Sequence, residues 1–186
     1  MVRTLLLLLI TNTPLFILSQ ELPQVDGKVV YNYQTTKEGV DKTALYAMAE
    51  RFLEDVIKKE NVVIQSSNPD SGQLIAKGIS AFTNHAKKGW TWTVGIATRP
   101  QFVMQFDIKD EFASLTIKNI MLSTLYVDEE IYLPIEDDMV REKRKIQSLK
   151  GKLKEKRTKE YNKNADMIND HFYSILVLFK RELDKL

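Results

Sequence analysis

The sequence contains no cysteine, and this absence excludes several kinds of protein. Disulfides, thiolate metal sites and attachment of a lipid to an N-terminal cysteine all require that residue. The fold must therefore be stabilised by burial of apolar side chains alone. A chain of 186 residues is long enough for one core of ordinary domain size.

Glycine and histidine are scarce, which removes most catalytic and cofactor motifs. The chain has seven glycines and two histidines, and it contains neither a Gly-x-Ser-x-Gly nucleophile motif nor a glycine-rich phosphate loop. His85 and His171 lie far apart in the sequence, and neither has partners at a metal-ligand spacing. We therefore expect no cofactor, no metal and no enzymatic activity. A hydrolase site assembled from scattered Asp, Glu and His residues is the less favoured alternative.

Two acidic clusters, Asp128–Glu130 and Glu136–Asp138, offer the oxygen ligands that calcium prefers. Neither cluster has the alternating ligand spacing and the glycine of a calcium loop. We interpret the first cluster as a solvated strand end and the second as the start of a helix, where carboxylates favour the helix dipole.

Long hydrophobic runs are absent except at the N-terminus. Arg3 precedes the apolar run Leu5–Ile10, which continues after an interruption that contains Pro14. This pattern is typical of a secretory signal peptide, and the run is shorter than the roughly 20 apolar residues of a membrane-spanning helix. We expect a signal peptide over residues 1–19, cleavage near Ser19, and a soluble periplasmic or secreted product.

An excess of charge of one sign is also absent, since the formal net charge is only +2. Such a balance gives no argument for a polyanionic partner of the whole molecule. Cations nevertheless concentrate between residues 141 and 159. The segment is either a solvated helix or arm, or a basic surface that binds anionic membrane headgroups. The candidate residues of that surface are Lys143, Arg144, Lys145, Lys150, Lys152, Lys154, Lys156 and Arg157.

Residues 20–186 predict one α+β domain in the order strand, helix, four strands, helix. β-Branched and aromatic residues over 29–33 predict the first strand, and apolar residues recur at helical spacing after Asp41, whose side chain can cap a helix. Charge dominates the segment 136–163, with Gly151 as a break. The apolar stripe of 164–186 predicts a C-terminal helix that packs on the sheet.

Two hairpins are predicted in the middle of the chain. A short strand over 62–64 leads through the turn Asn68–Gly72 to the strand Leu74–Ala81, in which alternation alone does not decide the buried face. The second hairpin turns at Asp110–Glu111. Its second strand covers 112–121, and its first strand buries alternate residues: Phe102, Met104, Phe106 and Ile108. We expect an antiparallel sheet of about five strands, packed against both helices.

This order of elements, together with several residues, resembles a known family. The matching segments are Gly27–Val30, Leu45–Leu53, Gly72–Gly78 and the hairpin Phe106–Ile120. Over residues 27–121 the pattern resembles DUF4468, a family of exported Bacteroidetes proteins of unknown function with a TBP-like fold. The resemblance implies a fold and export. Because function must be argued from a site, the name of the fold implies no nucleic-acid partner.

The second hairpin departs from the family pattern. The family usually carries Lys-Asp-Gly-Arg at this turn, followed by an aromatic residue and a second Arg. In this chain Glu111 stands at the glycine position, and Phe112 and Ser114 stand at the two arginine positions. The resemblance therefore does not imply that this chain has any function that those arginines serve in the family.

One segment with two tryptophans is the strongest candidate for a binding site. Trp90 and Trp92 have strand spacing, so both indoles point to one side, and Lys87 and Lys88 precede them. Flat aromatic rings bind sugars and protein partners, although the simpler interpretation is that these two cover one end of the sheet. We expect a non-enzymatic envelope module that binds a protein or glycan through this segment or an exposed sheet face. The basic surface is the alternative site.

Overall fold

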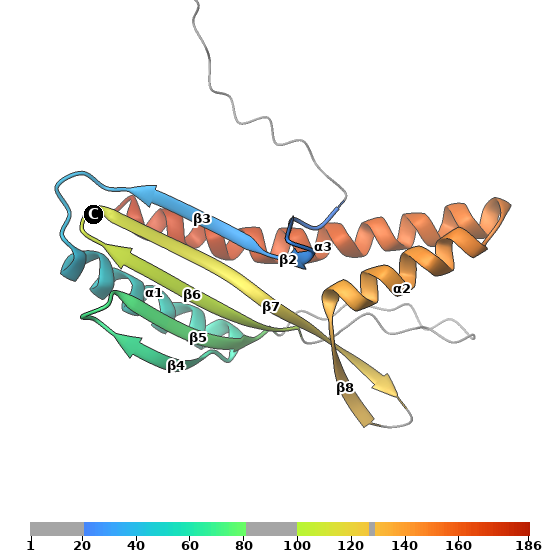
Figure 1. The fold of residues 1–186 in the computed structure, drawn as a ribbon, viewed down its shortest axis with the longest axis horizontal. Helices are drawn as coiled ribbons and strands as arrows, with labels where there is room; N and C mark the ends of the chain where they lie inside the picture. The colour runs from blue at the N-terminus through green and yellow to red at the C-terminus, as the bar shows by residue number, and fades with distance from the viewer. Residues whose placement is uncertain (1–20, 81–99, 127–128) are drawn as a thin grey trace, which may run out of the picture.

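The computed structural model describes residues 21–80, 100–126 and 129–186, and within them an antiparallel sheet is covered by helices on one face (Figure 1). The elements are β1 (Gln24–Val25), β2 (Lys28–Val29), β3 (Tyr31–Thr36), α1 (Lys42–Glu60), β4 (Val63–Asn68), β5 (Gln73–Ile79), β6 (Gln101–Lys109), β7 (Phe112–Tyr126), β8 (Glu129–Pro134), α2 (Ile135–Ser148) and α3 (Gly151–Leu183).

The α+β class with an antiparallel sheet is confirmed, but the number of strands is larger than predicted. The described sheet has six strands in the order β3-β7-β6-β5-β4, and β8 pairs with β7. A separate ribbon of β1 and β2 precedes it. The predicted first strand is divided at Val30 into β2 and β3.

Helix α1 forms where the sequence predicts it. The side chain of Asp41 accepts a hydrogen bond from the backbone N–H of Ala44 at 2.8 Å, which satisfies one of the free donors of the first turn. The apolar stripe of the helix is buried, as its spacing indicated: Leu45, Met48, Ala49, Phe52, Leu53 and Val56.

Strand β5 shows which of its two faces is buried. Leu74 and Ala76 are fully buried, whereas Lys77 is exposed. Gly78 lies on the buried side, where a Cβ atom would come within 2.5 Å of the Phe102 ring. Close contact between this glycine and the phenylalanine of the neighbouring strand therefore fixes the face that alternation left open.

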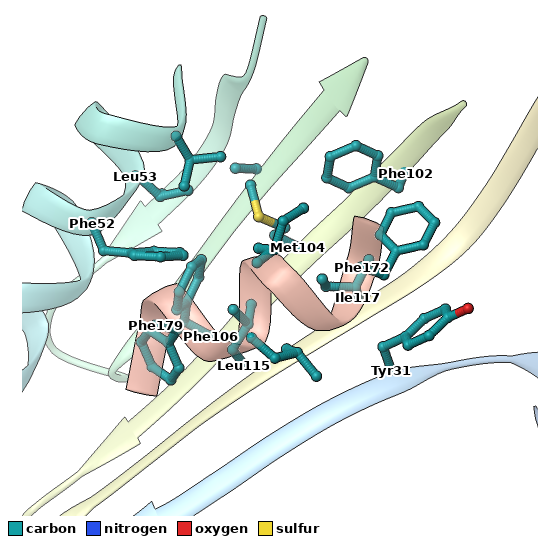
Figure 2. Packing of buried hydrophobic residues seen from close by; sticks show 14 of the residues in the cluster. Tyr31, Phe52, Leu53, Phe102, Met104, Phe106, Leu115, Ile117, Phe172 and Phe179 are labelled. Carbon is teal, nitrogen blue, oxygen red and sulfur yellow. The ribbon is translucent and has the colours of Figure 1, made fainter. Parts of the chain in front are cut away.

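The core is built around aromatic rings from three elements. Phe52 of α1, Phe106 of β6 and Phe179 of α3 form a mutual cluster with centroid separations of 5.3 to 6.0 Å (Figure 2). Because both helices contribute rings to the same cluster, they cover the same face of the sheet. The C-terminal helix packs on the sheet, as its apolar stripe predicted.

A buried polar pair lies in this core. The hydroxyl of Tyr31 donates a hydrogen bond to Oδ1 of Asn169 at 2.8 Å, and the Tyr31 ring lies 5.0 Å from that of Phe172. Burial raises the pKa of Tyr31 far above its ordinary value, with a smaller contribution from Tyr173. The pair therefore remains neutral at every physiological pH and joins β3 to α3.

The C-terminal helix begins earlier than predicted. The sequence placed its start at residue 164, but α3 begins at Gly151 and the preceding charged residues form α2. The acids at the start of α2 and the break at Gly151, which has a φ of +53°, agree with the prediction. The sequence missed the first turns of α3 because the segment 151–163 packs beside α2 and lacks the apolar stripe that marks contact with the sheet.

Candidate functional site

The tryptophan segment lies outside the described residues. Trp90, Trp92, Lys87 and Lys88 fall within residues 81–99, and the expected signal peptide of residues 1–19 is also outside the described ranges. Both expectations stay predictions. Two other candidate surfaces lie within the described residues, namely the uncovered face of the sheet and the basic segment.

The face of the sheet opposite α1 and α3 carries two rows of side chains that are polar except for Ile75. In Figure 1 both helices lie behind the sheet. Strand pairing places the members of each row side by side across β3, β7, β6 and β5. One row comprises Asn32, Thr116, Gln105 and Ile75, and the second comprises Gln34, Ser114, Asp107 and Gln73. We call these eight residues the helix-free face.

Hydrogen bonds connect the side chains of the helix-free face. The Asp107 carboxylate accepts from Gln105 at 2.9 Å and from Gln73 at 3.4 Å, and Lys118 donates to the Gln105 carbonyl at 2.7 Å. A connected network fixes the orientation of each amide, since every amide has distinct donor and acceptor ends. The surface thus presents hydrogen-bond donors and acceptors in fixed orientations.

The turn between β6 and β7 supports one end of this face. Glu111 adopts a φ of +59°, which is uncommon for a residue with a side chain. Its N–H donates to the Val40 carbonyl at 2.9 Å, and its carbonyl accepts from the Lys37 N–H at 2.7 Å. Its carboxylate accepts from the Gly39 N–H at 2.8 Å. These three contacts offset the strain and hold the turn against the loop before α1.

Phe112 and Ser114, which follow this turn, also lie on this side of the sheet. Phe112 pairs with Lys109 and with Thr36, and Ser114 pairs with Asp107 and with Gln34. Phe112 is half-buried there, and Ser114 is buried.

The basic segment forms a helical hairpin that we call the basic arm, consisting of α2 and residues 151–163 of α3. The arm projects beyond the sheet, and its two helices are joined at the end that lies farthest from the sheet (Figure 1). Its base is attached to the N-terminal ribbon, because Glu136 accepts a hydrogen bond from the Val29 N–H at 2.7 Å. Lys143 pairs with Glu21 at 2.9 Å.

A single carboxylate joins the two helices of the basic arm. Glu142 of α2 accepts hydrogen bonds from Lys145 at 3.0 Å and from Nε of Arg157 on α3 at 3.0 Å. Burial alone would raise the pKa of Glu142, but these two cations outweigh burial and hold that pKa below its ordinary value. Glu142 is therefore ionised at neutral pH.

The eight predicted basic-surface residues separate into two groups. Lys143, Lys145 and Arg157 are neutralised by carboxylates within the protein. The side chains of the other five have no carboxylate partner among the described residues and are exposed: Arg144, Lys150, Lys152, Lys154 and Lys156. Only this second group is available to an external anion. The sequence could not make this distinction, because it depends on where Glu142 and Glu21 lie.

Other kinds of site find little support in the described part of the chain. There, no group of three or more His, Asp or Glu residues is arranged to hold a metal ion. No helix of these ranges is long and apolar enough to cross a membrane. A hollow along α3 is lined by side chains of both charges and by neutral polar groups: Lys154, Glu155, Thr158, Lys159, Asn162, Lys163 and Asp166.

An antiparallel sheet with helices on one face and a polar, helix-free opposite face defines an α+β domain of the TBP-like class. A family model described as a domain of unknown function (DUF4468) with TBP-like fold matches residues 31–123. This is half of the chain, and the chain belongs to that family. The matched residues contain the whole helix-free face, whereas the basic arm lies beyond them.

Two solved structures are similar in fold. A DUF4468 family protein from Bacteroides ovatus is 17% identical with a TM-score of 0.54, over 85% of this chain and 90% of that chain. A TBP-like protein from Parabacteroides distasonis is 13% identical with a TM-score of 0.52, over 85% of this chain and 96% of that chain. A comparison with curated proteins gives no match. These similarities show the fold alone.

Proposed function

We propose that this chain is a non-enzymatic module of the cell envelope that binds a protein or glycan partner on its helix-free face. The observation that carries the proposal is the connected network of amide, carboxylate and ammonium groups on that face. Hydroxyl-rich glycans and polypeptide backbones both require ordered donors and acceptors of this kind.

Location at the envelope is supported by the sequence of residues 1–19, with its cation, apolar run and small residue at the end. A binding role rather than a catalytic one is supported by the sequence-wide lack of nucleophile and phosphate-loop motifs. The envelope location and the non-catalytic role do not depend on whether the partner is a protein or a glycan.

Site-specific photocrosslinking in cells that export the chain tests the binding face. A benzophenone amino acid placed at Gln34 or Thr116 lies on the helix-free face, and the matched control at Thr43 lies on α1, an element that covers the opposite face. We expect crosslinked adducts from the first two positions and none from Thr43. Mass spectrometry of the adducts distinguishes a peptide partner from a glycan. Adducts at all three positions, or at none, would contradict the proposal.

Export is tested by the mass of the protein recovered from the periplasm or the medium. The expected product lacks residues 1–19 and begins near Gln20. Recovery of the full-length chain from the cytoplasm alone would contradict the envelope location. The crosslinking result would still report whether the helix-free face binds a partner.

A further inference from the structure

The end of the basic arm brings three apolar side chains, one of them largely exposed, together with cations that have no carboxylate partner in the described residues. Leu149 and Lys150 form the link between α2 and α3. Leu153, the third residue of α3, is 67% exposed, and Ile146 and Leu149 are half-buried. An isolated exposed leucine is ordinary. Three apolar residues at the end of a projecting hairpin form a local apolar tip.

Cations surround this tip. The five cations of the second group all fall within 144–156, a segment whose one acidic residue is Glu155. The arm is thus polarised along its length. Three acids, Glu136 to Asp138, lie in the first turn of α2 at the base, and the five cations of the second group lie toward the opposite end.

Helix stability does not account for this placement. The first turn of α3 has no acidic residue, and its N-cap residue Lys150 makes no side-chain capping bond. Lys152 and Lys154 lie close to the positive end of the helix dipole, which is unfavourable for cations. The tip therefore combines charges that destabilise the helix start with a leucine that gains little from packing. An external surface that is both anionic and apolar complements both features.

We infer that the tip of the basic arm docks end-on against an anionic lipid bilayer. The tip consists of the apolar residues Ile146, Leu149 and Leu153 and the cations Arg144, Lys150, Lys152, Lys154 and Lys156. The leucines enter the headgroup and acyl boundary, and the aliphatic stems of the lysines cross the same layer while their ammonium groups bind phosphates. The inference goes beyond the proposed binding face, which lies on a different surface.

Vesicle co-sedimentation of the full mature chain tests the electrostatic part. The probe is a vesicle of phosphatidylcholine with about one third phosphatidylglycerol, compared with phosphatidylcholine alone. The triple variant K150Q/K152Q/K154Q should lower partitioning onto the anionic vesicle by about tenfold or more. The matched control K28Q/K77Q/K109Q removes the same charge from exposed lysines outside the arm and should change partitioning by less than about twofold. Equal losses in both triples would overturn the inference.

A second pair of variants tests insertion of the apolar tip. Leu153→Ser should weaken partitioning at least about threefold, because a leucine contributes by burial in the boundary. Val63→Ser is the control, since Val63 is equally exposed at 67% but lies on the edge strand β4. If Leu153→Ser has no effect while soluble polyphosphate competes fully with the vesicles, the tip is a general anion-binding surface and the lipid assignment is wrong. Unchanged far-UV circular dichroism verifies that each variant is folded.

Discussion

Arg157 on α3 donates to the carboxylate of Glu142 on α2 through both Nε and a terminal guanidinium nitrogen, with Nε at 3.0 Å. The carboxylate belongs to a residue that is only 8% exposed. A charge-assisted pair of this kind has a defined geometry. It therefore sets the position of α2 against α3, and with it the direction in which the basic arm projects.

Replacing Arg157 by Met should destabilise the arm by roughly 2 kcal/mol, because the buried Glu142 carboxylate then keeps only Lys145 as a partner. Amide hydrogen exchange measures the effect locally, and α2 should lose protection while the sheet strands keep theirs. Arg144→Met is the control, as Arg144 is exposed on the same hairpin and has no carboxylate partner among the described residues. The same loss of protection in both variants would show that Arg157 has no special role.

The stability that the Glu142 ion pairs contribute should decrease as the pH falls. The folded-state pKa is below the ordinary value of 4.5, so the contribution is fully present above 4.5 and is lost as the pH falls through the folded-state pKa. The difference in unfolding free energy between the wild type and Glu142→Gln should therefore be largest near neutral pH and shrink in acid. Urea titrations at several pH values measure it. A difference that stays constant down to strongly acidic pH would contradict the assigned ion pairs.

The sequence predicted those elements whose side chains report directly on the core. The alternation that ends in Ile108 and the helical stripe from Ala165 to Leu183 both mark contact with the apolar interior, and both were correct. The extension of β7 beyond residue 121 was not predicted. A shift of register occurs where Asn119 adopts a φ of +53°, so that Ile120 and Leu122 become buried and simple alternation fails.

The candidate surfaces also have features that a local sequence pattern predicts and features that depend on contacts between distant segments. The sequence identified the cations of the basic arm, but the neutralisation of Lys143 by Glu21 depends on a contact 122 residues apart in the chain. It also anticipated an exposed sheet face without naming its residues. The rows of the helix-free face depend on the register of four strands, and no local pattern encodes that register.

Gly72→Ala should be far more destabilising than Gly39→Ala. Both glycines have positive φ, at +71° and +76°, so each substitution costs about 1 kcal/mol or more in backbone strain. A Cβ atom at Gly72 would in addition lie 1.9 Å from the Ile108 carbonyl oxygen, whereas at Gly39 nothing lies within 4 Å. Thermal unfolding should show a modest shift for Gly39→Ala and loss of the cooperative transition, or a much larger shift, for Gly72→Ala. Similar shifts would mean that the turn before β5 is not as close to β6 as described.

Tyr31→Phe should destabilise the domain by about 1 to 2 kcal/mol although the ring contacts remain. The change removes the hydroxyl that donates to Oδ1 of Asn169 at 2.8 Å and leaves that buried acceptor without its partner. Tyr33→Phe is the matched control, because Tyr33 lies on the same strand and its ring packs edge-on to Phe179, while its hydroxyl makes no hydrogen bond to a described residue.

Urea unfolding of the two variants gives the comparison, and the free energy should change by less than about 0.5 kcal/mol for Tyr33→Phe. A double variant of Tyr31→Phe with Asn169→Leu removes both members of the pair, so that no buried acceptor is left unsatisfied. It should recover part of the stability that Tyr31→Phe loses, because replacing both partners by apolar groups is less costly than leaving one alone. The loss of unfolding free energy in the double variant is compared with the sum of the losses in the two single variants. If the double variant loses more than that sum, Asn169 stabilises the core through a contact other than the Tyr31 hydroxyl.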